Sequence, residues 1–316
     1  MRAIVLDNGP VFRRDYAPPV QTPGESIVRV RTAGICGTDL EMARGYMGWQ
    51  GVLGHEFVGE VVKSETRGLV GRRVVGEINA ACGRCRQCAQ GLQRHCPNRT
   101  VLGILGRDGA FADFLTLPDK NLHPVPGSVP DELAVFTEPV AAAYEILEQR
   151  KFPRNYRILV LGDGRLGALA AMVLAAEDYD VTVGGRHREK LAALAALGLS
   201  TQLEAAVEGG YDVVIDCTGS GAGLLRALEL VRPRGTVVLK STAAAGANLN
   251  LARAVVNEIT MLGSRCGRMG PALDALAAGR LDPRPLISAV FPLDDGLAAL
   301  EAAGKASNFK ILLKVS

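Results

Sequence analysis

The sequence lacks any long apolar run, and it carries little net charge. The longest apolar candidate, residues 166–176, is bracketed by Arg165 and Glu177 and falls short of the roughly 18–20 residues that a membrane-spanning helix needs. Lysine and arginine exceed aspartate and glutamate by only 36 − 33 = 3 charges, which argues against a nucleic-acid or membrane-surface protein. The amino-terminal MRAIVLDNGP has only four apolar residues between Arg2 and Asp7 and does not resemble a signal peptide. We therefore expect a cytoplasmic protein that binds neither nucleic acid nor membranes.

The composition otherwise indicates a folded protein with reduced thiols. The 316 residues are 48% hydrophobic and 22% charged, which suits about two globular domains. Four of the seven cysteines fall within residues 82–96. In a reducing compartment, such a cluster indicates a metal site before it indicates disulfides.

Two regions of the chain have different periodicity. Up to about residue 125, short strand-like runs such as 26–31, 57–62 and 73–75 predict an antiparallel barrel or sandwich. From about 140 to 265, short apolar strands alternate with helical stretches, which predicts a doubly wound parallel sheet. There the expected strands are 157–161, 180–183, 212–216 and 235–240, and the expected helices are 166–177, 189–197 and 222–231. A last strand is expected at 310–315.

A glycine-rich turn joins the first of these parallel strands to the first helix. It reads Gly162-Asp163-Gly164-Arg165-Leu166-Gly167. The glycines permit a tight turn and close approach of the backbone to a pyrophosphate, whose charge the free N–H groups of the helix start can bind. The surrounding strand and helix favour a dinucleotide site, with Thr218 at a neighbouring strand end. The alternative is a glycine turn in an unrelated α/β domain.

The second parallel strand ends without the acidic residue that holds the ribose of NAD. The chain instead reads Gly184-Gly185-Arg186-His187-Arg188. A small residue leaves room for a 2′-phosphate, and the forked donors of Arg186 and Arg188 suit that phosphate. We expect NADP to be preferred, with NAD possible as a second cofactor. The alternative is that both arginines only begin a solvated helix.

The cysteine cluster predicts a closed metal site. Its four thiolates, at Cys82, Cys85, Cys88 and Cys96, can complete a tetrahedral shell around Zn²⁺ and leave no open position, which is typical of structural zinc. An iron–sulfur cluster is the competing interpretation.

A second, open site is indicated by Cys36, His55 and Glu138, which stand in GICGTD, GHE and TEP segments. A cysteine, a histidine and a carboxylate form a three-ligand zinc set that leaves a fourth position for water or substrate.

Six motifs together resemble the zinc-dependent medium-chain dehydrogenase/reductase family, which is alcohol dehydrogenase-like. They are GICGTD (34–39), GHE (54–56), the cysteine loop (82–96), GAFADF (109–114), TEP (137–139) and GDGRLG (162–167). They run in the family's order, and the Glu-Pro pair is similar to the polyol, glucose and threonine dehydrogenase branches. The resemblance implies an α/β protein with a GroES-like β-barrel catalytic domain, 1–139 with 266–316, and a Rossmann domain, 140–265.

The resemblance also implies roles for single residues. Cys36, His55 and Glu138 match the ligands of a catalytic zinc, and Glu56 matches an acidic neighbour that approaches the metal when water exchanges. With the cysteine loop, this implies two Zn²⁺ per chain.

Three further residues lie in or after the GICGTD motif. Thr38 matches the hydroxyl that passes the substrate proton, and Asp39 matches the carboxylate that supports a ligand histidine. Glu41 departs from the pattern, because many relatives carry a histidine there that continues the proton relay.

The implied function is hydride transfer between NAD(P) and an alcohol, which could be a secondary alcohol, a polyol or a sugar. A small-molecule alcohol or carbonyl substrate and a homodimer or homotetramer are implied as well. Two alternatives stay open: a non-catalytic NADPH-binding regulatory protein on the same scaffold, and a zinc-free quinone or enone reductase. The presence of both zinc-ligand sets argues against the second.

Overall fold

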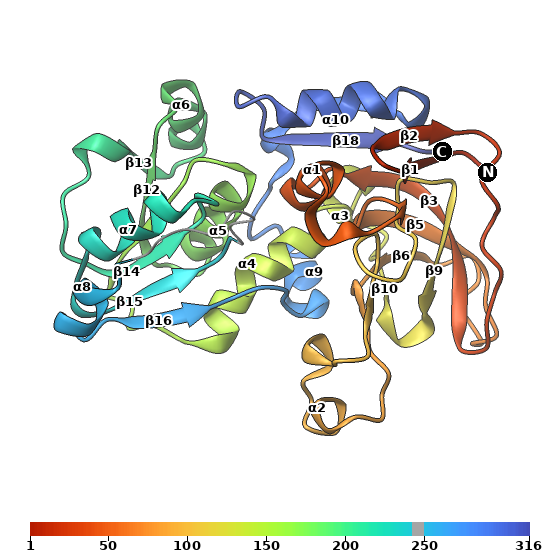
Figure 1. Ribbon diagram of the computed structural model, residues 1–316, viewed down its shortest axis with the longest axis horizontal. Coiled ribbons are helices and arrows are strands. Elements are labelled where there is room, and N and C mark those ends of the chain that lie inside the picture. The colour runs from red at the N-terminus through yellow and green to blue at the C-terminus, as the bar shows by residue number, and fades with distance from the viewer. Residues whose placement is uncertain (242–249) are drawn as a thin grey trace. The chain divides into compact units, whose positions relative to one another are not determined.

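The computed structural model describes residues 1–241 and 250–316, and the chain divides into two compact units (Figure 1). Unit 1 comprises Met1–Glu138 and Met269–Ser316, and unit 2 comprises Pro139–Arg268. Among the described residues, no helix has the length and apolar character required to cross a membrane.

Unit 1 is built on a seven-stranded sheet. Its order is β10-β6-β5-β3-β18-β17, with β9 also paired to β3. Every pairing is antiparallel except that of β17 with β18. The strands are β3 (Glu25–Gly34), β5 (Glu56–Lys63), β6 (Arg73–Gly76), β9 (Phe114–Pro118), β10 (Leu122–Pro124), β17 (Ile287–Pro292) and β18 (Lys310–Lys314). Alternate side chains of β3, such as Val28 and Val30, are buried, as the period of two predicts.

Smaller elements complete unit 1. Its other strands are β1 (Ala3–Leu6), β2 (Pro10–Arg13), β4 (Gly51–Val52), β7 (Asn79–Ala80) and β8 (Thr100–Val101). Its helices are α1 (Gly37–Ala43), α2 (Arg86–Ala89), α3 (Asp131–Ala134), α9 (Met269–Ala277) and α10 (Gly296–Gly304). Short 3₁₀ turns lie at Tyr46–Gly48, Gln93–His95, Asp119–Asn121, Arg284–Leu286 and Leu293–Asp295. Helix α10 packs on β17 and β18.

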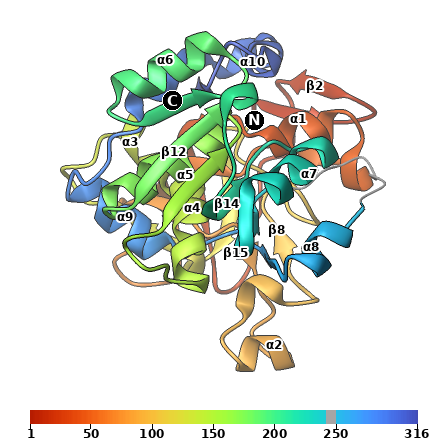
Figure 2. The same cartoon turned by 90° about the vertical axis from the view of Figure 1, so that its left-hand side faces the viewer.

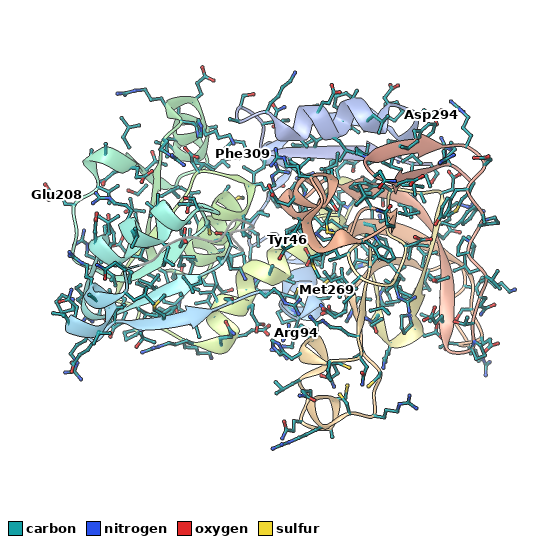
Figure 3. All side chains as sticks on the ribbon, viewed as in Figure 1. Tyr46, Arg94, Glu208, Met269, Asp294 and Phe309 are labelled. Carbon is teal, nitrogen blue, oxygen red and sulfur yellow. The ribbon has the colours of Figure 1, made fainter. Side chains whose placement is uncertain are left out.

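The direction of β18 decides which of its residues lies near the metal ligands. Phe309 precedes β18 and Asp294 precedes α10, and the two side chains mark opposite ends of this helix–strand layer (Figure 3). Leu312 pairs with Gly34 of β3. Lys310 therefore lies at the end of β18 that approaches the segment after β3.

Unit 2 is a six-stranded, all-parallel sheet in the order β13-β12-β11-β14-β15-β16. Its strands are β11 (Arg157–Leu161), β12 (Asp180–Gly185), β13 (Ser200–Leu203), β14 (Tyr211–Asp216), β15 (Val231–Leu239) and β16 (Thr260–Gly263). Helices α5 (Arg165–Ala176), α6 (Arg188–Ala196), α7 (Gly221–Leu230) and α8 (Ala252–Val256) connect them (Figure 2). A 3₁₀ turn lies at Glu204–Ala206, and α4 (Thr137–Gln149) begins in unit 1 and continues in unit 2.

The predicted alternation of strands and helices is confirmed, and the central elements agree with their expected bounds within a few residues. The two edge strands β13 and β16 were not expected. Both lack the apolar run that marks a buried parallel strand, because β13 reads Ser-Thr-Gln-Leu and neither strand has a fully buried residue. Edge strands are covered less completely, so their sequences carry a weaker signal.

Candidate metal centres and cofactor site

Cys36 follows β3 and precedes α1, and a buried carboxylate fixes this turn. The backbone N–H of Cys36 donates to Oδ2 of Asp39 at 2.8 Å. The Thr38 hydroxyl lies 3.9 Å from the Cys36 sulfur. The thiol and a hydroxyl are therefore presented together at the start of α1.

The same carboxylate orients His55, which immediately precedes β5. Oδ1 of Asp39 lies 3.1 Å from Nδ1 of His55, and both side chains are buried. Burial lowers the pKa of His55, but the charge and hydrogen bonds of Asp39 and Cys36 outweigh it and raise the pKa well above its ordinary value. The surroundings thus favour positive charge, and with Nδ1 engaged by Asp39, Nε2 is the nitrogen left for a metal ion.

A buried ion pair lies beside these residues. Nζ of Lys310 contacts Oε2 of Glu56, and the two side chains are 2% and 1% exposed. The same ammonium donates to the carbonyl of Ile35 at 3.3 Å and lies 5.9 Å from the ring centroid of Phe136. Lys310 therefore contacts the segment before Cys36, the residue after His55 and the segment before Glu138. Sequence reasoning missed this lysine, because its partner Glu56 is 254 positions away.

A clustering of metal-ligand atoms identifies which donors converge. Within residues 1–241 and 250–316, ligand atoms of Cys36, His55 and Glu56 all lie within 4.8 Å of one another. The expected ligand Glu138 is not in this cluster. It is partly buried in the first turn of α4, and burial raises its pKa to about 7, with His55 opposing that rise and Glu56 adding to it. Glu138 therefore interacts electrostatically with the cluster, and its role as third ligand stays a prediction.

Glu41, which stands where a relay histidine is usual, forms an ion pair with Arg44. Its carboxylate accepts a hydrogen bond from Arg44 at 2.7 Å on the exposed side of α1.

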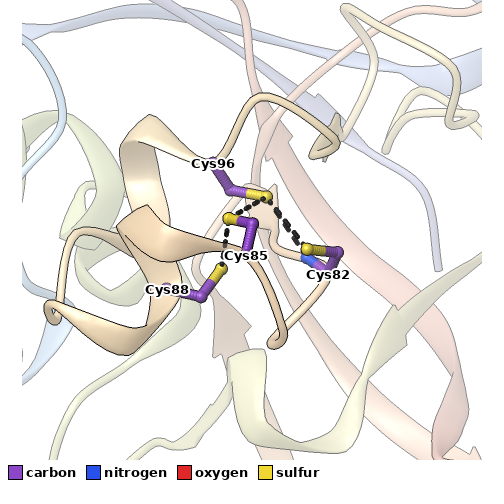
Figure 4. Close-up of side chains that lie close together, drawn as sticks. All are labelled: Cys82, Cys85, Cys88 and Cys96. Carbon is purple, nitrogen blue, oxygen red and sulfur yellow. Dashed lines mark hydrogen bonds between the residues drawn. The ribbon is translucent and has the colours of Figure 1, made fainter.

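The four predicted cysteines converge on one point (Figure 4). The sulfurs of Cys85 and Cys88 lie 3.4 Å apart, those of Cys85 and Cys96 3.7 Å, and those of Cys96 and Cys82 3.5 Å. Four sulfurs each about 2.3 Å from one zinc ion would be separated by about 3.8 Å. An iron–sulfur cluster places several atoms between its ligands and needs a wider cage. The spacing therefore fits a single tetrahedral ion.

The local backbone already favours a thiolate in this loop. A hydrogen bond from the backbone of Arg84 lowers the pKa of Cys82 to about 6, with a further contribution from Cys96. Burial raises the pKa of Cys88 to about 11, and Cys85 adds to that rise. Metal binding would supply the charge that deprotonates the remaining thiols.

The predicted dinucleotide turn lies at the carboxyl edge of the parallel sheet. Gly162 has φ +117°, a conformation that favours glycine, and Gly164 is the N-cap of α5. A side chain at Gly167 would overlap the Gly162 carbonyl, so the helix packs closely on the turn. Thr218 follows β14, and its hydroxyl and N–H donate to Asp216 at 2.7 and 2.9 Å. The register pairs Leu161 with both Gly184 and Asp216, so these strand ends are neighbours.

The end of β12 differs from the sequence expectation in one respect. Gly185 itself has no carboxylate, but Asp163 of the glycine turn lies against it and accepts hydrogen bonds from the backbone and ring of His187. Arg186 is 71% exposed and lies 3.5 Å from Glu204. Arg188 begins α6 and is exposed.

Comparisons with known proteins agree with this geometry. The model of the alcohol dehydrogenase GroES-like domain matches residues 22–127, and that of the zinc-binding dehydrogenase matches residues 166–278. The L-threonine 3-dehydrogenase of Streptomyces coelicolor is 31% identical over 99% of both chains.

Solved structures extend the likeness to the whole chain. The alcohol dehydrogenase TADH from Thermus sp. ATN1 is 30% identical, with a TM-score of 0.89 and complete coverage of both chains, at 100% each. A zinc-binding dehydrogenase from Sinorhizobium meliloti 1021, bound to NADP, has a TM-score of 0.91 at 26% identity and covers 99% of each chain.

The chain belongs to the zinc-dependent medium-chain alcohol dehydrogenase family, and it is an NAD(P)-dependent alcohol oxidoreductase that acts on a small molecule. The expected GroES-like and Rossmann architecture is confirmed.

Proposed function

We propose that this enzyme binds two zinc ions per chain and transfers a hydride between a secondary alcohol, polyol or sugar and NADP. The observation that carries the proposal is the convergence of Cys36 and His55 with the buried carboxylate of Glu56, in a chain that also has a dinucleotide turn. Cys36, His55 and Glu138 would hold the catalytic ion, and Cys82, Cys85, Cys88 and Cys96 the structural ion. The donor types and the spacing of the sulfurs fit zinc.

Each residue near the open site has a separate task in the proposed reaction. A zinc ion bound there would lower the pKa of an alcohol or polarise a carbonyl, and the nicotinamide would accept or supply the hydride. The Thr38 hydroxyl, 3.9 Å from the Cys36 sulfur, passes the substrate proton. Asp39 holds His55 in one tautomer and orientation.

Glu56 would serve as the movable carboxylate beside the metal. Its carboxylate belongs to the cluster of metal-ligand atoms and is simultaneously paired with Lys310. The ion pair would hold Glu56 away from the metal when Glu138 serves as the third ligand. An equivalent carboxylate without a cationic partner would be costly to bury.

The preference for NADP is supported by the residues that follow β12. Gly185 carries no carboxylate of its own, and Arg186 and Arg188 are both exposed to solvent and able to approach a 2′-phosphate. Gly162 to Gly167 would hold the pyrophosphate, and Thr218 lies at the adjacent strand end. NAD remains the second cofactor in this proposal.

A homodimer or homotetramer in the cytoplasm completes the proposal. Cys82, Cys85, Cys88 and Cys96 are thiols rather than disulfides, which suits a reducing compartment, and metal ligation is the chemistry that this compartment permits for the cluster. The oligomeric state rests on the family resemblance.

The proposal is tested by metal analysis combined with a substrate panel. We expect two zinc ions per chain by mass spectrometry, and turnover of at least one alcohol, polyol or sugar that is faster with NADP⁺ than with NAD⁺. Chelation should abolish turnover and added Zn²⁺ should restore it. Cys36→Ser should retain one zinc and lose turnover. Full turnover in protein shown to lack the catalytic zinc would contradict the proposal, and NADPH binding without any turnover would favour a regulatory protein.

A further inference from the structure

The glycine turn supplies a carboxylate at the place where the strand end has none. A Cβ built on Gly185 would lie 2.5 Å from both Cβ and Oδ2 of Asp163. The side chain of Asp163 therefore fills the volume in which a side chain of residue 185 would begin. Many doubly wound folds hold the adenosine ribose with one acidic residue at this strand end. Here Gly185 supplies the space and Asp163 supplies the carboxylate.

This carboxylate is held by one neighbouring residue. The backbone N–H of His187 donates to Oδ2 of Asp163 at 2.7 Å, and Nδ1 of the same histidine lies 2.9 and 3.1 Å from the two oxygens. Burial raises the pKa of Asp163, but the hydrogen bonds and charge of His187, with the charge of Lys190, outweigh it and leave the pKa below its ordinary value. Asp163 is therefore ionised at neutral pH.

An ionised carboxylate at this point distinguishes two nucleotides. Its two oxygens offer about four acceptor directions, and His187 does not use all of them. A ribose 2′-hydroxyl can donate to the remaining direction, whereas a 2′-phosphate is repelled by the negative charge. Arg186 and Arg188 act in the opposite sense, because they attract the phosphate.

We propose that Asp163 and His187 form a specificity-determining pair in which the carboxylate binds an unphosphorylated ribose and limits the preference for NADP. His187 reduces this effect of Asp163 on nucleotide preference, because it donates hydrogen bonds to the carboxylate and occupies some of its acceptor directions. The inference rests on the proposed dinucleotide binding and assigns a task to two residues that the glycine motif alone does not distinguish.

The test compares Asp163→Asn, His187→Ala and the control Asp180→Asn. Asp180 is an exposed carboxylate at the start of β12, the strand that ends at Gly185. Its replacement by asparagine removes one negative charge, as Asp163→Asn does, but at the far end of the strand. Titration calorimetry with 2′,5′-ADP and 5′-ADP isolates the ribose end of the cofactor. The readout is the ratio of the two dissociation constants, and the experiment uses the zinc-loaded full chain.

The two variants should shift this ratio in opposite directions. Asp163→Asn should increase the preference for 2′,5′-ADP about tenfold, and His187→Ala should decrease it about fivefold, both within the range expected for losing one typical hydrogen bond. Asp180→Asn should leave it unchanged. Should Asp163→Asn fold poorly, His187→Ala still tests the pair, because His187 is half exposed.

Two results would overturn the assignment. One is an unchanged ratio in a variant that still binds nucleotide, and the other is a shift of both variants in the same direction, which indicates general damage to the turn. Failure of the unmodified protein to bind either nucleotide would instead overturn the proposed function, and the pair with it.

Discussion

Replacing Lys310 with methionine should destabilise unit 1 strongly, because it leaves a buried charge without its partner. Lys310 and Glu56 are 2% and 1% exposed, so water cannot solvate the carboxylate that remains. Removing one member of such a pair costs about 3–5 kcal/mol. The hydrogen bond to the Ile35 carbonyl is lost as well, so we expect a value toward the upper end of that range.

The chain carries its own probe for this measurement. Trp49 is the single tryptophan and lies in unit 1 with Lys310. Its fluorescence during urea unfolding should report the decrease in the free energy of unfolding. At a slope of about 2 kcal/mol per molar urea, the midpoint should fall by about 2 M.

Two further variants separate the ion pair from a general effect on β18. Lys314→Met changes an exposed lysine on the same strand and should alter stability by less than about 0.5 kcal/mol. The double variant Lys310→Met with Glu56→Gln removes both charges and should recover most of the lost stability. A loss below about 1 kcal/mol for Lys310→Met, or strict additivity in the double variant, would refute the reasoning.

The remaining predictions concern the cysteine loop, the Thr38 hydroxyl and the ion pair of Glu25 with Arg107. Cys85→Ser should reduce the zinc content from two ions to one and expose the loop to proteolysis, whereas Cys217→Ser should keep both ions. Thr38→Val should lower kcat at least about a hundredfold with little change in zinc content or KM. Burial raises the pKa of Glu25, but Arg107 outweighs it and lowers the pKa below its ordinary value; the pair therefore stabilises the fold above about pH 4.3. Its contribution should fall as the pH drops through the lowered pKa, and Glu25→Gln should flatten that part of the stability curve.

Local patterns predicted most of the parallel unit. The apolar strand, the glycine turn and the Ala/Leu-rich helix are adjacent in sequence, so the period of each run was sufficient to place 157–161 and 166–177 close to the observed β11 and α5. The cysteine loop was predictable for the same reason, because its ligands share one short segment. Sequence reasoning failed where the contact is purely spatial.

Lys310 and Asp163 illustrate that limit. Lys310 stands in an apolar strand near the carboxyl terminus, and only the pairing of β18 with β3 brings it to Glu56. Asp163 is a variable position of a glycine motif, and only the parallel register of β11 with β12 places it against Gly185. Neither pair of partners is recognisable by spacing, since each depends on which strands become neighbours.

The most direct test of the account is a crystal structure of the zinc-loaded enzyme with anomalous diffraction recorded on both sides of the zinc edge. The account predicts two peaks per chain. One should lie among the four cysteine sulfurs, and the other should lie about 2.0–2.3 Å from the Cys36 sulfur, Nε2 of His55 and a carboxylate oxygen of Glu138. A fully loaded protein with no zinc peak at Cys36 and His55 would contradict it.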